Sequence, residues 1–442
     1  MKIGKLTNEA ERSIQTKHPK STSLVIILIM TLLAGCANSS SAEELIKPEK
    51  DFEVMQVEQN EMDDVKDESI HSINLMAVEL LQEMAKENQD TNILFSPTSL
   101  AFALAMLQNG AEGETKEGIV KVLQENEKGM NERYNLFMNY LMSLDKDADA
   151  DIPGIKMNIA NSLWLREDIK PKQAFVDDLN AYYNAQVFRE DFSNKKTIDQ
   201  MNQWVEDQTN KLLKGTIKEI APETIAYLMN TVYFKGTWRN EFPESLTNKE
   251  AFYTTTQDSS FINMMHKTES LPYYEDELCQ MTSLSYYGGS SMVVVLPKGD
   301  IDEYLKDLDD EILQNILVNG KDNNQRLQLS LPKLDIEVHN PLKELLANQG
   351  MEKAFSPNEA EFQSMIEVAG ENVYVSDIFQ NARIILDEKG TEAAAVTVVD
   401  MNVTSAQVPS EPIVFECNKP FLYIIKDDAS GAILFVGIVR RP

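Results

Sequence analysis

The chain has 442 residues, with 41 basic and 71 acidic side chains, 43% hydrophobic residues and only three cysteines. This composition excludes disordered, collagen-like and disulfide-scaffold proteins. The formal charge of −30 disfavours nucleic acid and heparin-like polyanions as partners, because binding phosphate or sulfate requires clustered Lys and Arg. The length allows either two or three domains or one large unit.

The N-terminus is typical of an export signal. Five basic residues precede the apolar run 24–33 (LVIILIMTLL), which is too short to span a bilayer as a helix. The run leads into Leu33-Ala34-Gly35-Cys36, which resembles a bacterial lipoprotein signal. The resemblance implies removal of residues 1–35, lipid attachment (palmitate included) at Cys36, and an exported protein anchored to the cell envelope, facing the extracytoplasmic or extracellular space.

An acidic stretch follows the signal. Between residues 37 and 68 there are eleven acidic side chains and three lysines, a composition that predicts a solvated tether over residues 36–68. Removal of residues 1–35 leaves 36 basic and 69 acidic residues, so maturation makes the chain more acidic, at about −33. We therefore place the folded domain at residues 69–442.

The domain begins with helical patterns and continues with strand patterns. Apolar residues recur at helical spacing from Ile73 to Met84, the stretch Ser99–Leu107 predicts a second helix after Pro97, and helices are expected to about Leu213. The second half contains β-rich runs at 227–234, 291–296, 326–338, 373–386 and 421–439. A helix-rich half followed by a strand-rich half predicts an α+β fold.

The common catalytic signatures are missing from the sequence. Beyond the signal the histidines are His71, His266 and His339, and none lies in an HExxH motif or beside a GxSxG turn. Cys279 and Cys417 lack metal-ligand spacing; we interpret them as two buried thiols, with a disulfide between them as the alternative. We expect no enzyme activity, no cofactor and no metal.

The segment from Asp387 to Pro412 has a period-two pattern. Odd positions from Thr391 to Met401 are small or apolar, whereas Glu392 and Asp400 fall on even positions. The pattern is compatible with a strand that buries one face, although Ala and Glu also favour a helix.

Six segments in order resemble the serpin family: 92–100 (NILFSPTSL), 103–119, 230–238 (NTVYFKGTW), 331–337 (LPKLDIE), 386–399 (LDEKGTEAAAVTVV) and 418–442. The resemblance implies the serpin fold, with a helix-rich N-terminal half, a large central β-sheet, further β-sheets and an exposed reactive-centre loop. It also implies a monomer that inhibits serine proteases as a suicide substrate. In that mechanism the protease cuts the loop, is trapped as an acyl-enzyme, and is carried along as the loop inserts into the main sheet.

The resemblance also assigns residues to the loop. The hinge of an inhibitory member would comprise Glu388, Gly390, Thr391, Ala393, Ala394 and Ala395. Counting forward from Glu388 places the reactive bond at Thr404–Ser405, whereas counting back from Phe415 favours Ala406–Gln407. No Lys or Arg lies between Val396 and Phe415, which disfavours a trypsin-like target and favours an elastase-, subtilisin- or chymotrypsin-like one.

Five further residues match positions that control opening of the sheet in serpins. Ser96, Ser99 and Asn230 match a polar cluster under the sheet, Gln380 stands where the family often has a histidine, and Trp238 matches a tryptophan where the loop first inserts. A helix cap for the serines and a plain core role for Trp238 are the alternatives. The alternative function is a non-inhibitory serpin acting as an envelope-bound binding protein.

Overall fold

The computed structural model describes residues 44–53, 62, 65–144, 155–221, 224–254, 258–318, 323–367, 372–391 and 411–442. They belong to one compact unit, Glu43–Pro442. This unit begins earlier than the predicted boundary at residue 69, because residues 44–53, predicted as part of a solvated tether, pair with a strand and pack on a helix. The predicted signal at 1–35 and Cys36 lie outside the described residues.

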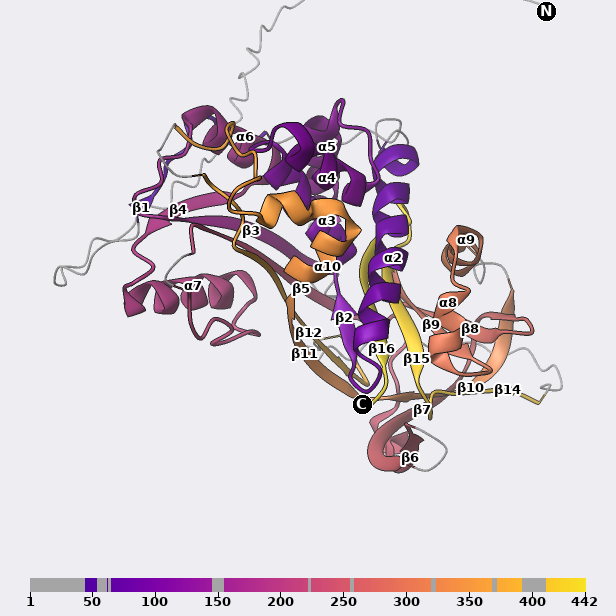
Figure 1. Ribbon diagram of the computed structural model, residues 1–442. Coiled ribbons are helices and arrows are strands. Elements are labelled where there is room, and N and C mark those ends of the chain that lie inside the picture. The colour runs from indigo at the N-terminus through magenta and orange to yellow at the C-terminus, as the bar shows by residue number, and fades with distance from the viewer. Residues whose placement is uncertain are drawn as a thin grey trace, which may run out of the picture. The chain divides into compact units, whose positions relative to one another are not determined.

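The strands within this part of the chain form two sheets (Figure 1). The seven-stranded sheet has the order β1-β4-β3-β5-β13-β12-β11. Its strands are β1 (Glu44–Leu45), β3 (Lys156–Arg166), β4 (Gln186–Glu190), β5 (Ala226–Thr237), β11 (Leu334–Pro341), β12 (Asp377–Asp387) and β13 (Gly390–Thr391).

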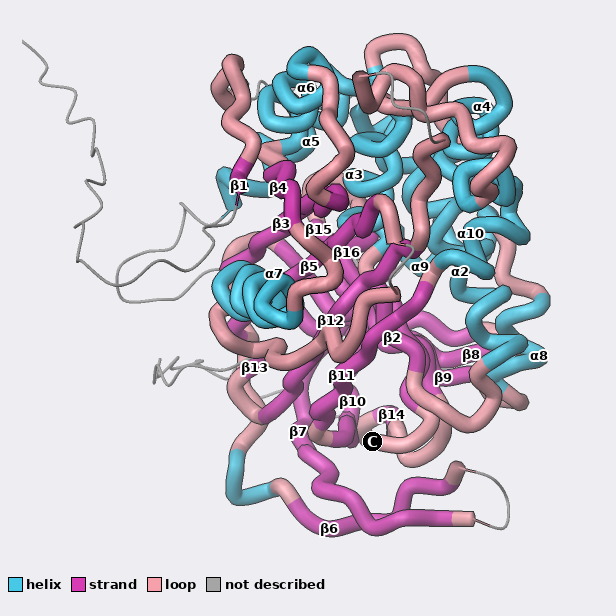
Figure 2. The backbone as a smooth tube through the Cα atoms, turned by 60° about the vertical axis from the view of Figure 1, so that its left-hand side comes forward, coloured by secondary structure: helices cyan, strands magenta, loops and turns pink. Residues whose placement is uncertain are grey.

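The nine-stranded sheet has the order β14-β10-β7-β8-β9-β15-β16-β2, with β6 paired to β7. Its strands are β2 (Ile93–Phe95), β6 (Asn248–Tyr253), β7 (Ser259–Glu275), β8 (Cys279–Ser285), β9 (Ser290–Pro297), β10 (Asn324–Pro332), β14 (Ile413–Glu416), β15 (Phe421–Asp427) and β16 (Ile433–Val439). Figure 2 shows the β6–β7 hairpin extending from one end of the molecule.

Helices cover both faces of the seven-stranded sheet, with α7 on one face and α3, α4, α5 and α6 on the other (Figure 1). The helices are α2 (His71–Glu87), α3 (Pro97–Gln108), α4 (Gly113–Leu123), α5 (Met130–Ser143), α6 (Gln173–Tyr183), α7 (Lys195–Gln208), α8 (Ile301–Lys306), α9 (Asp310–Val318) and α10 (Lys343–Leu346). None of the helices in the described ranges is long and apolar enough to cross a membrane.

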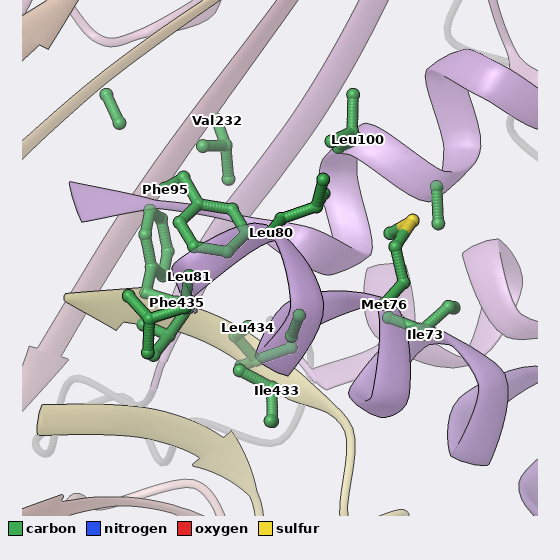
Figure 3. Close-up of a cluster of buried hydrophobic side chains, with 14 of the residues drawn as sticks. Ile73, Met76, Leu80, Leu81, Phe95, Leu100, Val232, Ile433, Leu434 and Phe435 are labelled. Carbon is green, nitrogen blue, oxygen red and sulfur yellow. The ribbon is translucent and has the colours of Figure 1, made fainter. Parts of the chain in front are cut away.

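Helix α3 lies at the centre of the main core. Pro97 occupies its first turn, and the Ser96 hydroxyl caps it by accepting a hydrogen bond from the Ser99 N–H at 3.2 Å. Every residue of α3 is buried, and Leu100 belongs to the same buried cluster as Leu80 of α2, Phe95 of β2 and Phe435 of β16 (Figure 3). The helix therefore packs against the face of the seven-stranded sheet that is opposite α7.

A second core lies on the opposite face of that sheet. Helix α7 places Met201, Trp204 and Val205 against the sheet residues Trp164, Tyr227 and Met229. This face also carries Phe379 of β12, whose ring stacks on Tyr227 of β5 with centroids 5.2 Å apart. The α+β class and the large central sheet agree with the sequence-based prediction.

Several element predictions need adjustment. The run 326–338 forms two strands, β10 and β11, that separate at Lys333, and the run 421–439 forms β15 and β16 with a turn between them. The strand predicted from Val373 begins at Asp377. The region expected to be helical up to Leu213 also contains the strands β3 and β4.

Candidate functional site

The predicted hinge begins in a tight turn between β12 and β13. The Lys389 N–H donates to the Asp387 carboxylate at 2.9 Å, and the chain then reverses into Gly390–Thr391. These two residues pair antiparallel with β12 on one side and with β5 on the other. The first two residues after the turn therefore already form a short central strand of the sheet.

Strands β5 and β12 are separated only at this end. Further along they pair directly and in parallel, with Tyr227–Thr231 of β5 opposite Asp377–Asn381 of β12. Asp377 faces Tyr227, and Asp387 faces Thr237 through Gly390, so both pairs differ by 150 in residue number. The two strands thus keep the same relative offset with or without a strand between them.

The side chain of Glu388 anchors the turn. Its carboxylate accepts hydrogen bonds from Lys333 Nζ at 2.7 Å and from Thr247 Oγ1 at 2.8 Å, while its carbonyl accepts the Phe242 N–H at 2.8 Å. Burial by itself would raise the pKa of Glu388, but the bonds from Lys333 and Thr247 outweigh burial and hold that pKa below its ordinary value. Glu388 is therefore held as a carboxylate.

Only glycine fits at position 390. Its φ is +149°, and a Cβ added there would lie 2.1 Å from the Gly236 carbonyl oxygen and 2.9 Å from the Thr237 Cα. Both neighbouring atoms belong to the β5 backbone, so they cannot rotate away as a flexible side chain would. This geometry explains why the hinge motif has Gly at this position.

Thr391 points into the protein interior, where Trp238 also lies. The Thr391 and Tyr286 hydroxyls are 2.7 Å apart in a hydrogen bond, and the Tyr286 ring stacks on Trp238 with centroids 4.3 Å apart. Trp238 donates from Nε1 to the Asp387 carbonyl at 3.1 Å and from its backbone N–H to the Lys389 carbonyl at 2.9 Å. The structure therefore places Trp238 directly under the point where the hinge joins the sheet.

One buried network beneath the β5–β12 contact contains the other four residues predicted to control sheet opening, Ser96, Ser99, Asn230 and Gln380. Gln380 accepts the Ser96 N–H at 2.8 Å and donates to the Ser96 carbonyl at 2.9 Å and to Asn230 Oδ1 at 3.0 Å. Asn230 Nδ2 in turn donates to the Ser99 hydroxyl at 2.6 Å. The Ser96 helix cap is present as well, so the capping interpretation and the network hold together.

A fifth member of this network, Asn161 of β3, was not predicted from the sequence. Asn161 pairs with Asn230 in the sheet register and accepts a hydrogen bond from Asn230 Nδ2 at 2.8 Å. It is buried, and within the described residues its own Nδ2 has no hydrogen-bond partner. A polar residue next to the apolar stretch of Leu163–Leu165 was the available signal, but it carries meaning only once β3 is recognised as a strand.

The rest of the predicted loop lies outside the described residues. This applies to the hinge alanines Ala393, Ala394 and Ala395 and to both candidate reactive bonds, Thr404–Ser405 and Ala406–Gln407. The description resumes at Glu411, shortly before β14, which pairs in parallel with β10. The two ends of the loop therefore attach to different sheets.

Cys279 and Cys417 are both buried and free, so no disulfide joins them. Burial raises the pKa of the Cys279 thiol to about 11 and raises that of Cys417 further. Neither thiol is poised for reaction at neutral pH. Within the described ranges, no group of His, Cys, Asp and Glu side chains could hold a metal ion.

Comparison with known proteins agrees with this geometry. The family profile described as "Serpin (serine protease inhibitor)" matches residues 71–442. An uncharacterised serpin-like protein of Thermococcus kodakarensis is 31% identical over 84% of this chain and 85% of its own length, and Serpin A9 of Mus musculus is 32% identical over 82% and 86%.

Solved structures show the same fold. The native state of the thermophilic serpin tengpin superposes with a TM-score of 0.76 at 27% identity, covering 90% of this chain and 98% of tengpin. Human thyroxine-binding globulin in complex with its hormone gives 0.75 at 29% identity, covering 84% and 98%. The profile match, the relatives and the shared fold together show that this chain belongs to the serpin family.

Proposed function

We propose that this serpin inhibits a serine protease as a suicide substrate. The observation that carries the proposal is the position of Gly390–Thr391, which pair on both sides with β5 and β12 at an offset that the two strands already share further along. Insertion of more loop residues then requires only that the strands separate sideways, without sliding past each other. Newly formed backbone hydrogen bonds and newly buried apolar surface favour that insertion.

The chemistry is an interrupted acyl transfer. The protease serine attacks the scissile carbonyl of the loop, the new amino terminus of the C-terminal fragment leaves, and an acyl-enzyme ester links the protease to the loop. The cut releases the loop from its attachment before β14, so that it can insert with the protease still bound. The serpin supplies the bait and the stored conformational free energy, and it contributes no catalytic group.

The register predicts where the inserted residues will lie. Continued antiparallel pairing places Thr397 between Asn230 of β5 and Gln380 of β12, on the inner face that Thr391 shares. Glu392 and Asp400 then fall on the opposite face, as the period-two pattern predicts. The hydroxyl of Thr397 would take over the hydrogen bond that Asn230 and Gln380 now share.

The loop composition supports a target with a small or apolar specificity pocket. Without Lys or Arg between Val396 and Phe415, the carboxylate of a trypsin-like pocket would have no partner. Val403, Thr404 and Ala406 suit an elastase-like or subtilisin-like protease, and Met401 suits a chymotrypsin-like one. The proposal includes export and lipid anchoring at Cys36, which rest on the N-terminal sequence alone.

Incubation with representative elastase-, subtilisin- and chymotrypsin-like proteases tests the proposal. We expect an adduct that survives denaturation in SDS, together with a released C-terminal peptide. Mass spectrometry of that peptide distinguishes Ser405–Pro442 from Gln407–Pro442 and so identifies the bond. Simple turnover of the loop by every protease, with no adduct, would instead favour the non-inhibitory, envelope-bound binding protein.

A further inference from the structure

An extended N-terminal segment, Glu44–Glu53, binds along the outer edge of the seven-stranded sheet. Its first two residues form β1, which pairs antiparallel with β4 at Arg189 and Phe188, and the Ile46 N–H donates to the Val187 carbonyl at 3.0 Å. Figure 1 shows β1 beside β4, on the side of the sheet that lies away from β11 and β12. The segment thus adds an edge strand to the half of the sheet that contains β5.

The segment then follows helix α6 for the whole length of that helix. Its main chain is held by polar groups of α6: Gln173 donates to the Lys47 carbonyl at 3.2 Å, Asp177 accepts the Glu49 N–H at 2.6 Å, Asn180 donates to the Lys50 carbonyl at 2.8 Å, and the Ala181 carbonyl accepts the Glu53 N–H at 3.0 Å. Ile46 and Phe52 pack against the main core, so the contact is also apolar.

Asp177 shows that this surface is built for a bound backbone. Asp177 is buried, 6% exposed, and its carboxylate accepts hydrogen bonds from the Glu49 N–H and from the Gln173 amide. Burial alone would raise the pKa of Asp177, but these donors keep the pKa below its ordinary value. Without the segment, Asp177 would lose its bond to the Glu49 N–H.

The far end of the segment reaches a different part of the molecule. The Glu53 carbonyl accepts hydrogen bonds from Asn135 at 3.2 Å and from Asn139 at 3.0 Å, both on α5. Helix α5 is tied to the nine-stranded sheet, because the Tyr140 hydroxyl donates to Asp427 of β15 at 2.8 Å. The segment therefore bridges β4 of one sheet and a helix fixed to the other.

Loop insertion strains this bridge. An additional central strand moves the half that contains β5, β3 and β4 away from β12 and β11 by one strand spacing, about 4.8 Å. The β11 side is fixed to the nine-stranded sheet, since Asn340 donates to the Leu94 carbonyl of β2 at 2.8 Å. The Thr237 end of β5 is bonded to the nine-stranded sheet as well, since its carbonyl accepts the Tyr287 N–H at 2.9 Å, but β13 already separates β5 from β12 there. The movement therefore falls at the Tyr227 end of β5, which is the end that lies beside β4. The β4 end of the segment thus moves relative to its α5 end.

We infer that the surface of α6, β4 and α5 is a binding site for residues 44–53 and that their binding holds the uncut sheet closed. The inference rests on the proposed function, because it concerns control of the same insertion. Release of the segment lowers the barrier to insertion, so that the uncut protein converts to an inactive form without meeting a protease.

Two full-length variants test the inference from both sides of the contact. Phe52→Asp places a charge in the apolar part of the segment, and Asp177→Ala removes an acceptor of the segment backbone on α6. Phe261→Asp is the matched control, because it makes the same change at a phenylalanine of the β6–β7 hairpin that is 76% exposed and lies outside the segment. The measurement is the rate at which inhibitory capacity is lost at elevated temperature without protease.

We expect both test variants to lose inhibitory capacity at least tenfold faster than the wild type, and the control to match the wild type. The unfolding midpoint of the loop-cleaved form separates a specific effect from general damage, and we expect it to be unchanged. Wild-type rates in both test variants, or an equal loss of stability in the cleaved form, would overturn the inference. Failure of the proposed function is visible separately, as a wild-type chain that gains no stability on loop cleavage.

Discussion

Replacement of Thr391 by Arg tests whether hinge burial drives the proposed inhibition. Thr391 is 2% exposed, and its hydroxyl bonds to Tyr286 in the space beneath β5 and β12. In the uncut protein an arginine at this position can leave the sheet, but loop insertion then forces its guanidinium, unpaired, into the space beneath β5 and β12, which costs several kcal/mol. A penalty of about 3 kcal/mol on the insertion barrier slows insertion by roughly 150-fold. The acyl-enzyme ester is then hydrolysed before the protease is carried away from its starting position.

The assay is the number of inhibitor molecules consumed per protease molecule inactivated, read together with the SDS-stable adduct. Thr391→Arg should be cleaved at the same bond as the wild type but should form little adduct, so that many molecules are consumed. Thr391→Ser, which keeps the hydroxyl and the small size, should behave like the wild type. An arginine variant with wild-type stoichiometry would show that residue 391 is not buried during inhibition, and our explanation of the hinge would be wrong.

Three further substitutions follow from the same geometry. Glu388→Gln should lower the stability of the uncut protein by about 1–2 kcal/mol at neutral pH by weakening the bond to Lys333. Because the pKa of Glu388 is lowered on folding, this contribution is present above the ordinary value of 4.5 and is lost as the pH falls through the folded-state pKa, so denaturation of the two proteins should converge in acid. Gln380→His introduces a group that titrates near pH 6.5, and its loop-insertion rate should vary with pH across that region more than in the wild type; identical pH profiles would contradict this. Thr397→Val should destabilise the cleaved protein by about 1–3 kcal/mol in denaturant unfolding while leaving the uncut protein unchanged, because only the inserted strand needs the hydroxyl between Asn230 and Gln380.

Local sequence pattern predicted the parts of the fold that are buried on both faces. Strand β9 is buried along its whole length and apolar from Met292 to Leu296, most of β5 is buried, and α3 has a cap, a proline and an apolar stretch. Strand β3 was not recognised, because polar residues such as Asn158 and Asn161 interrupt its first half and the surrounding segments are helical. These asparagines are accommodated in the strand by specific hydrogen-bond partners, Gln208 for Asn158 and Asn230 for Asn161. A local sequence pattern does not reveal such partners.

The predicted hinge depended on motifs rather than on periodicity, and the structure supplies physical reasons for them. Gly390 is required by the backbone of β5, and Glu388 by Lys333 and Thr247, which are distant in sequence. The folded unit begins earlier in the chain than the predicted boundary at residue 69 for a comparable reason. The acidic composition of 36–68 indicated solvation, whereas the partners of residues 44–53 lie on α5 and α6, more than 80 residues further along.

The bound segment also changes the expected distance between this serpin and a membrane. Seven residues lie between Cys36 and Glu44, and the eight residue-to-residue steps that join them span at most about 29 Å when fully extended. With a lipid at Cys36, the domain would stand within that distance of the bilayer instead of at the end of a long acidic spacer. Mechanical pull on the anchor would act first on β1, a two-residue strand at the edge of the sheet that the proposed insertion must open.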